Sequence, residues 1–254
     1  MPRFFVCEEQ ASEGEILLTG SDAHHIARSL RMAVGDALTV CDTRGKEYDC
    51  RIASFEEDRQ VLVTVCSVRD AENEPPCRIR LLQALPKGDK LDTIIQKAVE
   101  CGVSEIIPFE SERCVTRVKP EAEERKTERR QRIAAEAAKQ CGRSVIPTVK
   151  RTVSFADMLS LAAESDLKLF CYEGDGTKPL GEVLRAEGGL RGKDISIVIG
   201  SEGGFSLGEA ERAVGAGLCP VGLGKRILRT ETASGFVLSC LVYVTELSGD
   251  ESKK

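Results

Sequence analysis

From Arg78 onward, short apolar segments alternate with helical segments, and this alternation restricts the possible folds more than any other feature of the chain. The segment "RIRLLQAL" precedes the helical pattern of "DKLDTIIQKAVECGV", and "DISIVIG" precedes "SLGEAERAVGAG". Such alternation is typical of a mainly parallel sheet covered by helices on both faces. Gly102 is placed to end the first of these helices. The sequence therefore predicts an α/β domain, which we expect to span residues 77–250.

The first 70 residues follow a different pattern, in which short β-type runs such as "EILLT" and "DALTVC" are separated by polar turns. One helical segment, "DAHHIARSL", interrupts them, with Asp22 placed to cap it. The polar segment "RDAENEPPC" then contains two adjacent prolines and is typical of a linker. We therefore expect a small, barrel-like β domain over residues 1–70, and the length of 254 residues allows two domains.

Several classes of protein are disfavoured by composition. No apolar run reaches the roughly 20 residues of a membrane-spanning helix, and the N-terminus lacks the apolar run of a signal peptide. The 11 cysteines form no C-x-x-C pair, which suits reduced thiols in the cytoplasm. The only two histidines, His24 and His25, have no further ligands at zinc-type spacing, so no metal is expected. We expect a cytoplasmic protein without a membrane partner.

The net charge of −5 requires any nucleic-acid contact to be local. The densest basic segment is "ERKTERRQR", from Glu124 to Arg132, and a solvated helix face is the favoured explanation, with a nucleic-acid contact as the alternative. Smaller basic groups occur at Arg28 with Arg31, and at Lys87 with Lys90.

A glycine-rich turn, "GSEGGFSLGE", begins at Gly200 between a predicted strand and a predicted helix, where α/β enzymes bind their ligands. It lacks the lysine of a phosphate-binding P-loop and the spacing of a dinucleotide fingerprint. The Glu202 carboxylate would repel a pyrophosphate, so we expect a neutral or cationic ligand, and S-adenosylmethionine meets that condition. Ser206 and Glu209 are predicted to form a capping box on the helix. A turn that needs glycine only for its conformation explains the same pattern.

A second motif, "LGKRILRTETASG", runs from Leu223 to Gly235 and brings three cations next to Glu231 and Thr232. An ordinary first helical turn flanked by solvated cations would have the same sequence. The helix that follows is apolar on nearly all sides, which suits burial either in a dimer or within one chain.

Together these motifs resemble the SPOUT superfamily of knotted methyltransferases and, more closely, the bacterial 16S ribosomal RNA uracil-N3 methyltransferases. The resemblance extends over nearly the whole chain and includes "HHIARSLRMAVGD", "KGDKLDTIIQKAVECGVSEIIPFESERCV" and "LGKRILRTETA". The family usually has proline where this chain has Ser201. The resemblance implies a PUA-like, RNA-binding β-barrel over residues 1–70, a SPOUT-type α/β domain with a trefoil knot over 77–250, and a homodimer.

The resemblance also implies an activity, the transfer of a methyl group from S-adenosylmethionine to N3 of a specific uridine in 16S ribosomal RNA. The partner would be that RNA or the small ribosomal subunit. The alternatives are a SPOUT methyltransferase with another RNA target and a non-catalytic RNA-binding factor of ribosome assembly. A nucleotide enzyme that binds phosphate in the glycine turn is disfavoured by Glu202.

Carried onto this sequence, the family pattern implies three loops that hold the cofactor, largely through backbone atoms. Their residues are Cys171, Tyr172, Glu173, Ile199, Gly200, Glu202, Gly203, Leu223, Gly224, Ile227, Leu228, Thr232 and Ala233. Arg229 is the candidate for stabilising charge on the uracil oxygens, since its planar donor fork cannot be copied by lysine. Glu231 is the candidate proton acceptor. The candidate RNA-binding residues are Arg3, His24, Arg28, Arg31, Lys87, Lys90, Arg113 and Arg143.

Overall fold

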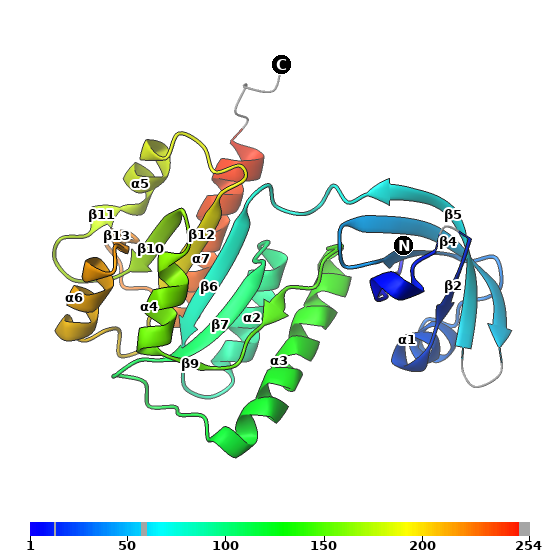
Figure 1. Ribbon diagram of the computed structural model, residues 1–254, viewed down its shortest axis with the longest axis horizontal. Coiled ribbons are helices and arrows are strands. Elements are labelled where there is room, and N and C mark those ends of the chain that lie inside the picture. Colours follow the sequence, from blue (N-terminus) through cyan, green and yellow to red (C-terminus); the bar gives the residue numbers. More distant parts are fainter. Residues whose placement is uncertain (13, 57–59, 249–254) are drawn as a thin grey trace. The chain divides into compact units, whose positions relative to one another are not determined.

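Two units make up the computed structural model, which describes residues 1–12, 14–56 and 60–248 (Figure 1). The first contains the described residues up to Glu74 together with residues 138–146, and the second contains residues 75–137 and the described residues from 147 on. The sequence patterns did not predict that residues 138–146 belong to the first unit. The predicted end of the α/β domain, residue 250, lies outside the described residues.

The first unit is built on a five-stranded sheet with the order β1-β3-β4-β5-β2. Strands β1 and β3 are parallel, and the other neighbours are antiparallel. The elements are β1 (Arg3–Phe5), η1 (Glu8–Gln10), β2 (Glu15–Leu18), α1 (Gly20–His24), η2 (His25–Ser29), β3 (Ala37–Cys41), β4 (Lys46–Glu56) and β5 (Gln60–Asp70). Phe4, Ile16 and Val40 belong to its buried core, to which the helical segment adds Ile26. The predicted small β domain is therefore confirmed as to its type.

The predicted cap of the first helix is wrong. Helix α1 begins one residue after Thr19, whose side chain makes no capping bond, and Asp22 lies inside the first turn. The Asp22 carboxylate instead accepts a hydrogen bond from Lys139 Nζ at 2.7 Å, and both residues belong to the first unit.

The second unit contains an eight-stranded sheet with the order β11-β13-β10-β12-β6-β7-β8, in which β9 also pairs with β7. All its strand pairs are parallel. The strands are β6 (Arg78–Ala84), β7 (Glu105–Glu110), β8 (Thr148–Val149), β9 (Val153–Ser154), β10 (Leu167–Cys171), β11 (Lys178–Pro179), β12 (Asp194–Ile199) and β13 (Cys219–Gly222). The predicted parallel α/β architecture is confirmed.

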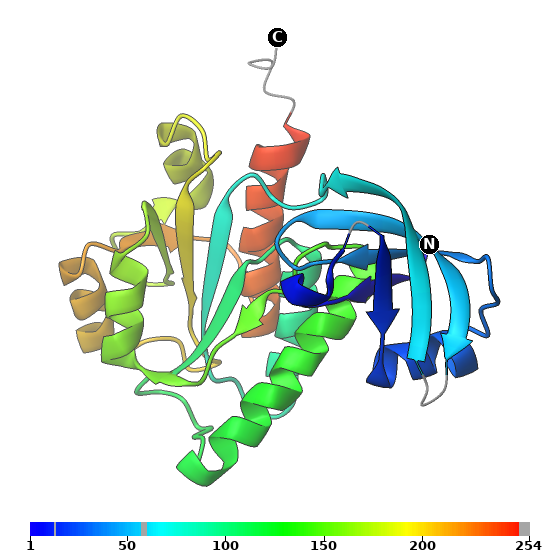
Figure 2. The same ribbon diagram turned by 45° about the vertical axis from the view of Figure 1, so that its right-hand side comes forward.

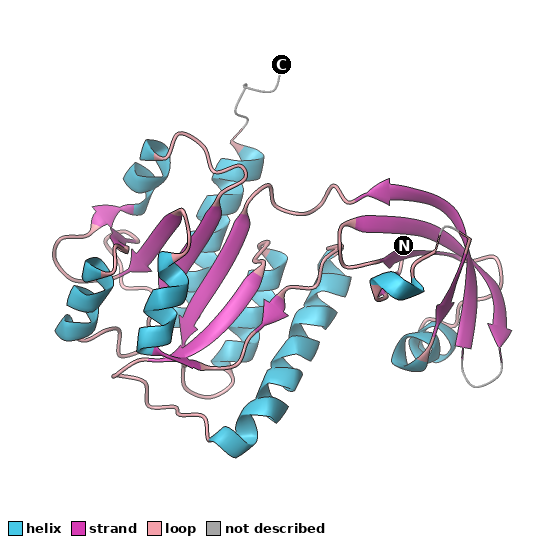
Figure 3. Cartoon of the chain, viewed as in Figure 1, coloured by secondary structure: helices cyan, strands magenta, loops and turns pink. Residues whose placement is uncertain are grey.

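Helices lie on both faces of this sheet, with α4 on one face and α2 and α7 on the other (Figures 1 and 2). Figure 3 shows the central strands side by side between these helices. The helical elements are α2 (Lys90–Glu100), α3 (Pro120–Cys141), α4 (Phe155–Ala163), α5 (Leu180–Ala186), α6 (Leu207–Gly215), α7 (Thr230–Val242) and η4 (Tyr243–Leu247), of which the end of α3, from residue 138 on, belongs to the first unit. None of the helices that the structure describes has the length and apolar character needed to cross a membrane.

Two helices, α2 and α7, test the sequence predictions directly. Gly102 follows α2 with φ +83°, and a Cβ at this position would lie 2.4 Å from Pro75 Cγ, so the predicted stop is confirmed and glycine is required there. Helix α7 buries Val237, Leu238 and Leu241, but Phe236 is 42% exposed. Burial on all sides is therefore not achieved within one chain.

Candidate active site

A cavity of about 700 Å³ lies in the second unit, where β10, β12 and β13 end. Because parallel strands end at the same edge of the sheet, the loops after these three strands come together there. Most of the cavity wall comes from residues 171–174, 199–205 and 222–230. A cavity of this size falls in the range that proteins use for small molecules and cofactors.

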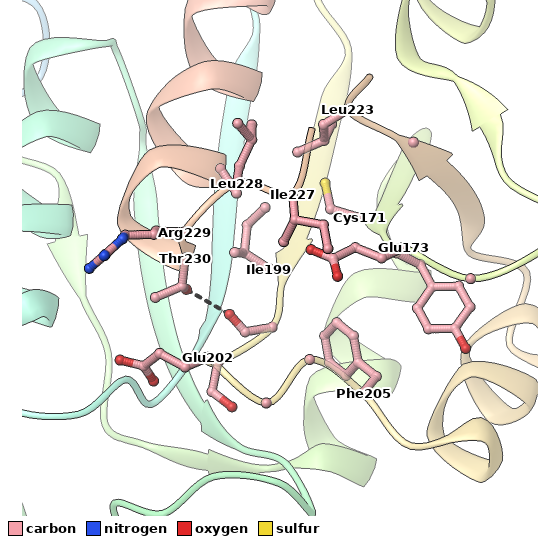
Figure 4. A pocket seen from close by; sticks show the side chains of 18 of the residues that line it. Cys171, Glu173, Ile199, Glu202, Phe205, Leu223, Ile227, Leu228, Arg229 and Thr230 are labelled. Carbon is pink, nitrogen blue, oxygen red and sulfur yellow. Dashed lines mark hydrogen bonds between the residues drawn. The ribbon is translucent and has the colours of Figure 1, made fainter. Parts of the chain in front are cut away.

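The structure brings nearly all of the predicted cofactor-binding residues to this cavity. Its lining includes Cys171, Tyr172, Glu173, Ile199, Gly200, Glu202, Gly203, Leu223, Gly224, Ile227, Leu228 and Ala233. Thr232 is exposed and does not belong to the lining. Figure 4 shows the apolar side chains of Ile199, Leu223 and Ile227 close to the Cys171 thiol. Burial raises the pKa of that thiol, which keeps it neutral and makes this part of the wall apolar.

The turn after β12 needs its glycines because other groups approach its backbone closely. A Cβ on Gly200 would lie 3.1 Å from Phe205 Cε2 and 3.2 Å from Gly204 Cα, and one on Gly203 would lie 2.9 Å from Arg113 Cβ. Arg113 also donates a hydrogen bond to the Gly203 carbonyl at 3.0 Å. The turn therefore exposes backbone atoms to the cavity with little room for side chains.

The predicted capping box of α6 is confirmed. Ser206 Oγ accepts from the Glu209 amide at 3.3 Å, and Glu209 Oε2 accepts from the Ser206 amide at 3.0 Å. The other Glu209 oxygen accepts from the Glu112 amide at 2.7 Å. Amide groups at the start of α6 are thus partly satisfied by the protein's own side chains.

Gln83, at the end of β6, holds two walls of the cavity together and was missed by the sequence analysis. Its Nε2 donates to Thr230 Oγ1 at 2.9 Å and approaches the Gly200 carbonyl at 3.4 Å. The Thr230 hydroxyl donates to the same carbonyl at 2.6 Å, as the dashed line in Figure 4 shows. Gln83 is fully buried. The available signal was a glutamine within the apolar segment "RIRLLQAL", because a buried amide needs partners.

Glu202 is held by the loop between β6 and α2. Its carboxylate accepts from Lys90 Nζ at 2.9 Å and from the Lys87 amide at 3.2 Å. Burial on its own would raise the pKa of Glu202, but the hydrogen bonds from Lys90 and from backbone amides outweigh this effect and lower it. Figure 4 shows the carboxylate pointing away from Ile227 and Phe205.

This pairing removes the basis of one sequence argument. The lining contains five cations, Lys90, Arg113, Lys225, Arg226 and Arg229, and only two carboxylates, Glu173 and Glu202. Since Lys90 compensates the charge of Glu202, this residue does not by itself exclude a phosphorylated ligand. Glu202 therefore does not select a cationic ligand by its charge alone, contrary to the expectation from the sequence.

Arg229 and Glu231 flank the start of α7. The Arg229 carbonyl accepts the amides of Thr232 and Ala233 at 2.9 and 2.8 Å, which fixes the backbone of this residue. Arg229 is exposed and belongs to the cavity lining, and its guanidinium makes no hydrogen bond or ion pair with any other residue that the structure describes. Figure 4 shows the guanidinium directed away from Ile227 and Cys171. Glu231 is not part of the lining, but one of its carboxylate oxygens lies 3.4 Å from Lys90 Nζ. That buried oxygen has no hydrogen-bond partner among the described residues.

The candidate RNA-binding residues fall into two groups. His24, Arg28, Arg31, Lys87 and Arg113 are exposed. Arg31 has φ +52°, a conformation that non-glycine residues seldom adopt. Three others are engaged by carboxylates of their own unit: Arg3 by Glu47, Arg143 by Glu74, and Lys90 by Glu202. The side chains of Arg3 and Arg143 are only 14% and 6% exposed.

No group of three or more histidine, cysteine, aspartate or glutamate side chains that could hold a metal ion exists among the described residues. The absence of a metal remains a prediction.

Two family models match this chain. The model described as an RNA methyltransferase domain matches residues 73–242, and the model described as an RNA methyltransferase PUA domain matches residues 18–66. The region matched by the RNA methyltransferase domain model includes every residue of the cavity lining.

Relatives match over nearly the full chain. The ribosomal RNA small subunit methyltransferase E of Bacillus subtilis is 35% identical, and the match covers 99% of this chain and 100% of the relative. The protein of the same name from Synechocystis is 34% identical over 93% of this chain and 76% of the relative.

A solved structure is similar to this chain in its three-dimensional fold. The crystal structure of a ribosomal RNA small subunit methyltransferase E from Neisseria gonorrhoeae, bound to S-adenosyl methionine, is 30% identical with a TM-score of 0.84. The match covers 95% of this chain and 97% of that chain.

Proposed function

The chain belongs to the RNA methyltransferase family, and we propose that it transfers a methyl group from S-adenosylmethionine to N3 of a uridine in the 16S RNA of the small ribosomal subunit. The observation that carries this proposal is the cavity at the ends of β10, β12 and β13. A relative of the same fold binds S-adenosyl methionine, and this chain has the apolar and backbone-lined walls that such a molecule needs.

The cavity fits this cofactor in two respects. Gly200, Gly203 and Gly204 line the cavity without side chains, which suits the close approach of an adenine and a ribose to the backbone. Ile199, Leu223 and the neutral Cys171 thiol provide an apolar surface for the adenine ring. When bound, S-adenosylmethionine supplies a sulfonium methyl group, whose carbon–sulfur bond breaks as N3 attacks, leaving the electron pair on sulfur.

The catalytic residues must assist the removal of a proton from the acceptor atom. N3 of uracil carries a proton, so this proton must leave before or during the attack. We assign Glu231 as the acceptor of the proton, because its carboxylate lies in the first turn of α7 and one of its oxygens has only the Lys90 ammonium, 3.4 Å away, as a partner among the described residues. Negative charge then develops on the two uracil oxygens. Arg229, whose guanidinium has no partner among those residues, is assigned to stabilise this charge through its donor fork.

The RNA would be held by exposed side chains, four cations and one histidine. We retain His24, Arg28, Arg31, Lys87 and Arg113 in this role and leave out Arg3, Arg143 and Lys90, whose charges are paired within the protein. The N3 edge of uracil is hidden in a duplex, so the target base must be splayed out of the RNA. Binding should weaken steeply with salt because it rests on phosphate contacts.

Helix α7 and the turn η4 support the proposal of a homodimer. Phe236, Tyr243 and Leu247 are 42%, 61% and 69% exposed, although each is a large apolar or aromatic side chain. They follow one another at spacings of seven and four residues, so they lie on one side of the helical segment. A second copy of the chain would cover this side.

The remaining predictions belong to the same proposal. The domain over residues 1–70 would bind RNA, the domain over 77–250 would carry the reaction and, through its family, the trefoil knot, and no metal would take part. A cytoplasmic location would follow from a ribosomal RNA substrate.

Mass-spectrometric mapping of methylated nucleotides in ribosomal RNA tests the function in cells. RNA from cells with the gene should contain 3-methyluridine at one position of the small-subunit RNA, and RNA from cells without it should lack that methyl group. Loss of a methyl group at another atom or in another RNA would contradict the N3 assignment. No change at all, with the protein present and folded, would favour a non-catalytic assembly factor.

A further inference from the structure

The turn after β12 and the start of α7 form adjacent walls of the cavity. Two sets of contacts, an inner and an outer connection, join them. The inner connection is the buried one through Gln83, which reaches Thr230 and the Gly200 carbonyl. The outer connection involves the neighbouring residues of the same two segments, Glu202 and Glu231. The inner connection is neutral, whereas the outer one consists of charges.

Lys90 provides the outer connection. Its Nζ lies 2.9 Å from Glu202 Oε1 and 3.4 Å from Glu231 Oε2, and the lysine itself belongs to the cavity lining. The hydrogen bond that Lys90 donates to Glu202, followed by the nearby carboxylate charges, raises the pKa of Lys90. The ammonium group is therefore charged and placed between carboxylates from two different walls. Without this cation the two carboxylates would repel each other across the cavity edge.

The position of Lys90 in its own helix does not explain its presence. It is the first residue of α2, where the helix dipole favours negative rather than positive charge. The exposed residue Lys97 lies in the last turn of the same helix, where a cation is favoured. The contacts of Lys90 with Glu202 and Glu231 are therefore the interactions that account for a cation at this place.

We propose that Lys90 is a positioning residue, which holds the Glu202 turn and Glu231 in the arrangement that the methyl-donor cavity requires, and that it is not an RNA contact. This inference rests on the proposed function, since it concerns how the same cavity is organised. Lys90 would act through Glu202 on the backbone of the cofactor turn, and through Glu231 on the proton acceptor. Its loss should therefore weaken cofactor binding and also slow turnover.

Four proteins test the proposal: the unaltered chain and the variants Lys90→Met, Lys90→Arg and Lys97→Met. The affinity for S-adenosylmethionine is measured by calorimetry without RNA, and kcat and KM are measured with small-subunit RNA. We expect Lys90→Met to lose about tenfold in cofactor affinity and a similar factor in kcat, since a hydrogen bond between charged groups is lost. Lys90→Arg should recover most of both losses, and Lys97→Met should match the unaltered chain. Melting temperatures identify a variant that fails to fold, in which case Lys90→Arg carries the test.

A comparison variant separates the two roles of a lysine near the cavity. The Lys87 side chain is exposed and its contact with Glu202 is made by the backbone amide, which a side-chain change leaves in place. Lys87→Met should raise KM for RNA and leave the cofactor affinity unchanged. If Lys90→Met behaves in that same way, Lys90 is an RNA contact and the proposal is overturned. Failure of the unaltered chain to bind S-adenosylmethionine would instead count against the proposed function.

Discussion

One wall of the cavity consists mainly of backbone atoms, and another consists mainly of side chains. The turn from Gly200 to Gly204 offers mainly backbone, and its tight contacts leave little space for side chains. The segment from Leu223 to Arg229 offers side chains, among them three cations. A backbone wall suits a cofactor that must be held in one place, and a side-chain wall suits a reaction that needs donors directed at developing charge. We therefore expect changes in the first wall to affect cofactor binding and a change of Arg229 in the second wall to affect turnover.

Arg229→Lys gives the largest expected effect and tests the side-chain wall. Lysine retains the charge but loses the planar fork that can reach two oxygens, so kcat should fall by about a hundredfold, as it does when an oxyanion donor is removed. The affinity for S-adenosylmethionine, measured by calorimetry, should stay within a factor of about two, because most cofactor contacts are expected from backbone atoms. Unchanged turnover would remove Arg229 from the catalytic assignment.

Gly200→Ala tests the backbone wall and should have the next largest effect. The new Cβ would lie 3.1 Å from Phe205 and 3.2 Å from the Gly204 backbone, so the turn has to shift. Overpacking of this kind costs about 1–3 kcal/mol, and we expect a loss of about tenfold or more in cofactor affinity.

Gly208→Ala is the matched control for that variant. A Cβ on Gly208 has no atom within 4 Å, and the residue lies in α6, where alanine is favoured over glycine. Its cofactor affinity should equal that of the unaltered chain. If Gly200→Ala binds the cofactor equally well, the close approach at this turn has no role in binding.

Thr230→Val tests whether the two walls are coupled through the inner connection. Valine has a similar shape but removes the hydroxyl that donates to the Gly200 carbonyl and accepts from Gln83. The free energy of unfolding should fall by about 1–2 kcal/mol, since buried polar groups lose a partner. Thr230→Ser keeps the hydroxyl and should lose less. Denaturant unfolding measures both, and equal losses in the two variants would show that the methyl group, rather than the hydroxyl, matters.

The smallest effect concerns the pH dependence of the outer connection. The pKa of Glu202 in the folded protein is lowered from its ordinary value of 4.5, so its ionised form contributes stability above that pH and loses the contribution as the pH falls through the folded-state pKa. Melting temperatures of the unaltered chain and of Glu202→Gln should differ most near neutral pH. The difference should shrink below about pH 4.5. A difference that stays constant down to pH 3 would contradict the pairing with Lys90.

Much of the fold follows from local patterns in the sequence. Alternating strands and helices predict the parallel sheet, and the stop at Gly102 and the capping box of Ser206 and Glu209 are set by residues close together in the chain. These features need no knowledge of distant contacts. The predicted cap at Asp22 failed because its carboxylate is bound by Lys139, which is 117 residues away.

In the candidate site, too, contacts between residues far apart in the sequence could not be predicted. The structure brings the residues of the two sequence motifs to one cavity, but the motifs do not show which partner each charge meets. Glu202 and Lys90 are 112 residues apart. Because they pair, neither residue presents to a ligand the full charge that its sequence context suggests. Gln83 joins Thr230 across 147 residues. Contacts of this kind are set by the order of strands in the sheet, which periodicity does not reveal.

The most direct test of the proposed reaction uses the purified protein with S-adenosylmethionine whose methyl group is isotopically labelled. After incubation with small ribosomal subunits or their RNA, the RNA is digested and its nucleosides are identified by mass spectrometry. The account predicts label in 3-methyluridine from one site, and a reduction of about a hundredfold in its rate of formation with Arg229→Lys. Label on C5 of uridine, on a ribose oxygen or on another base, or no transfer by a protein that binds the cofactor, would contradict it.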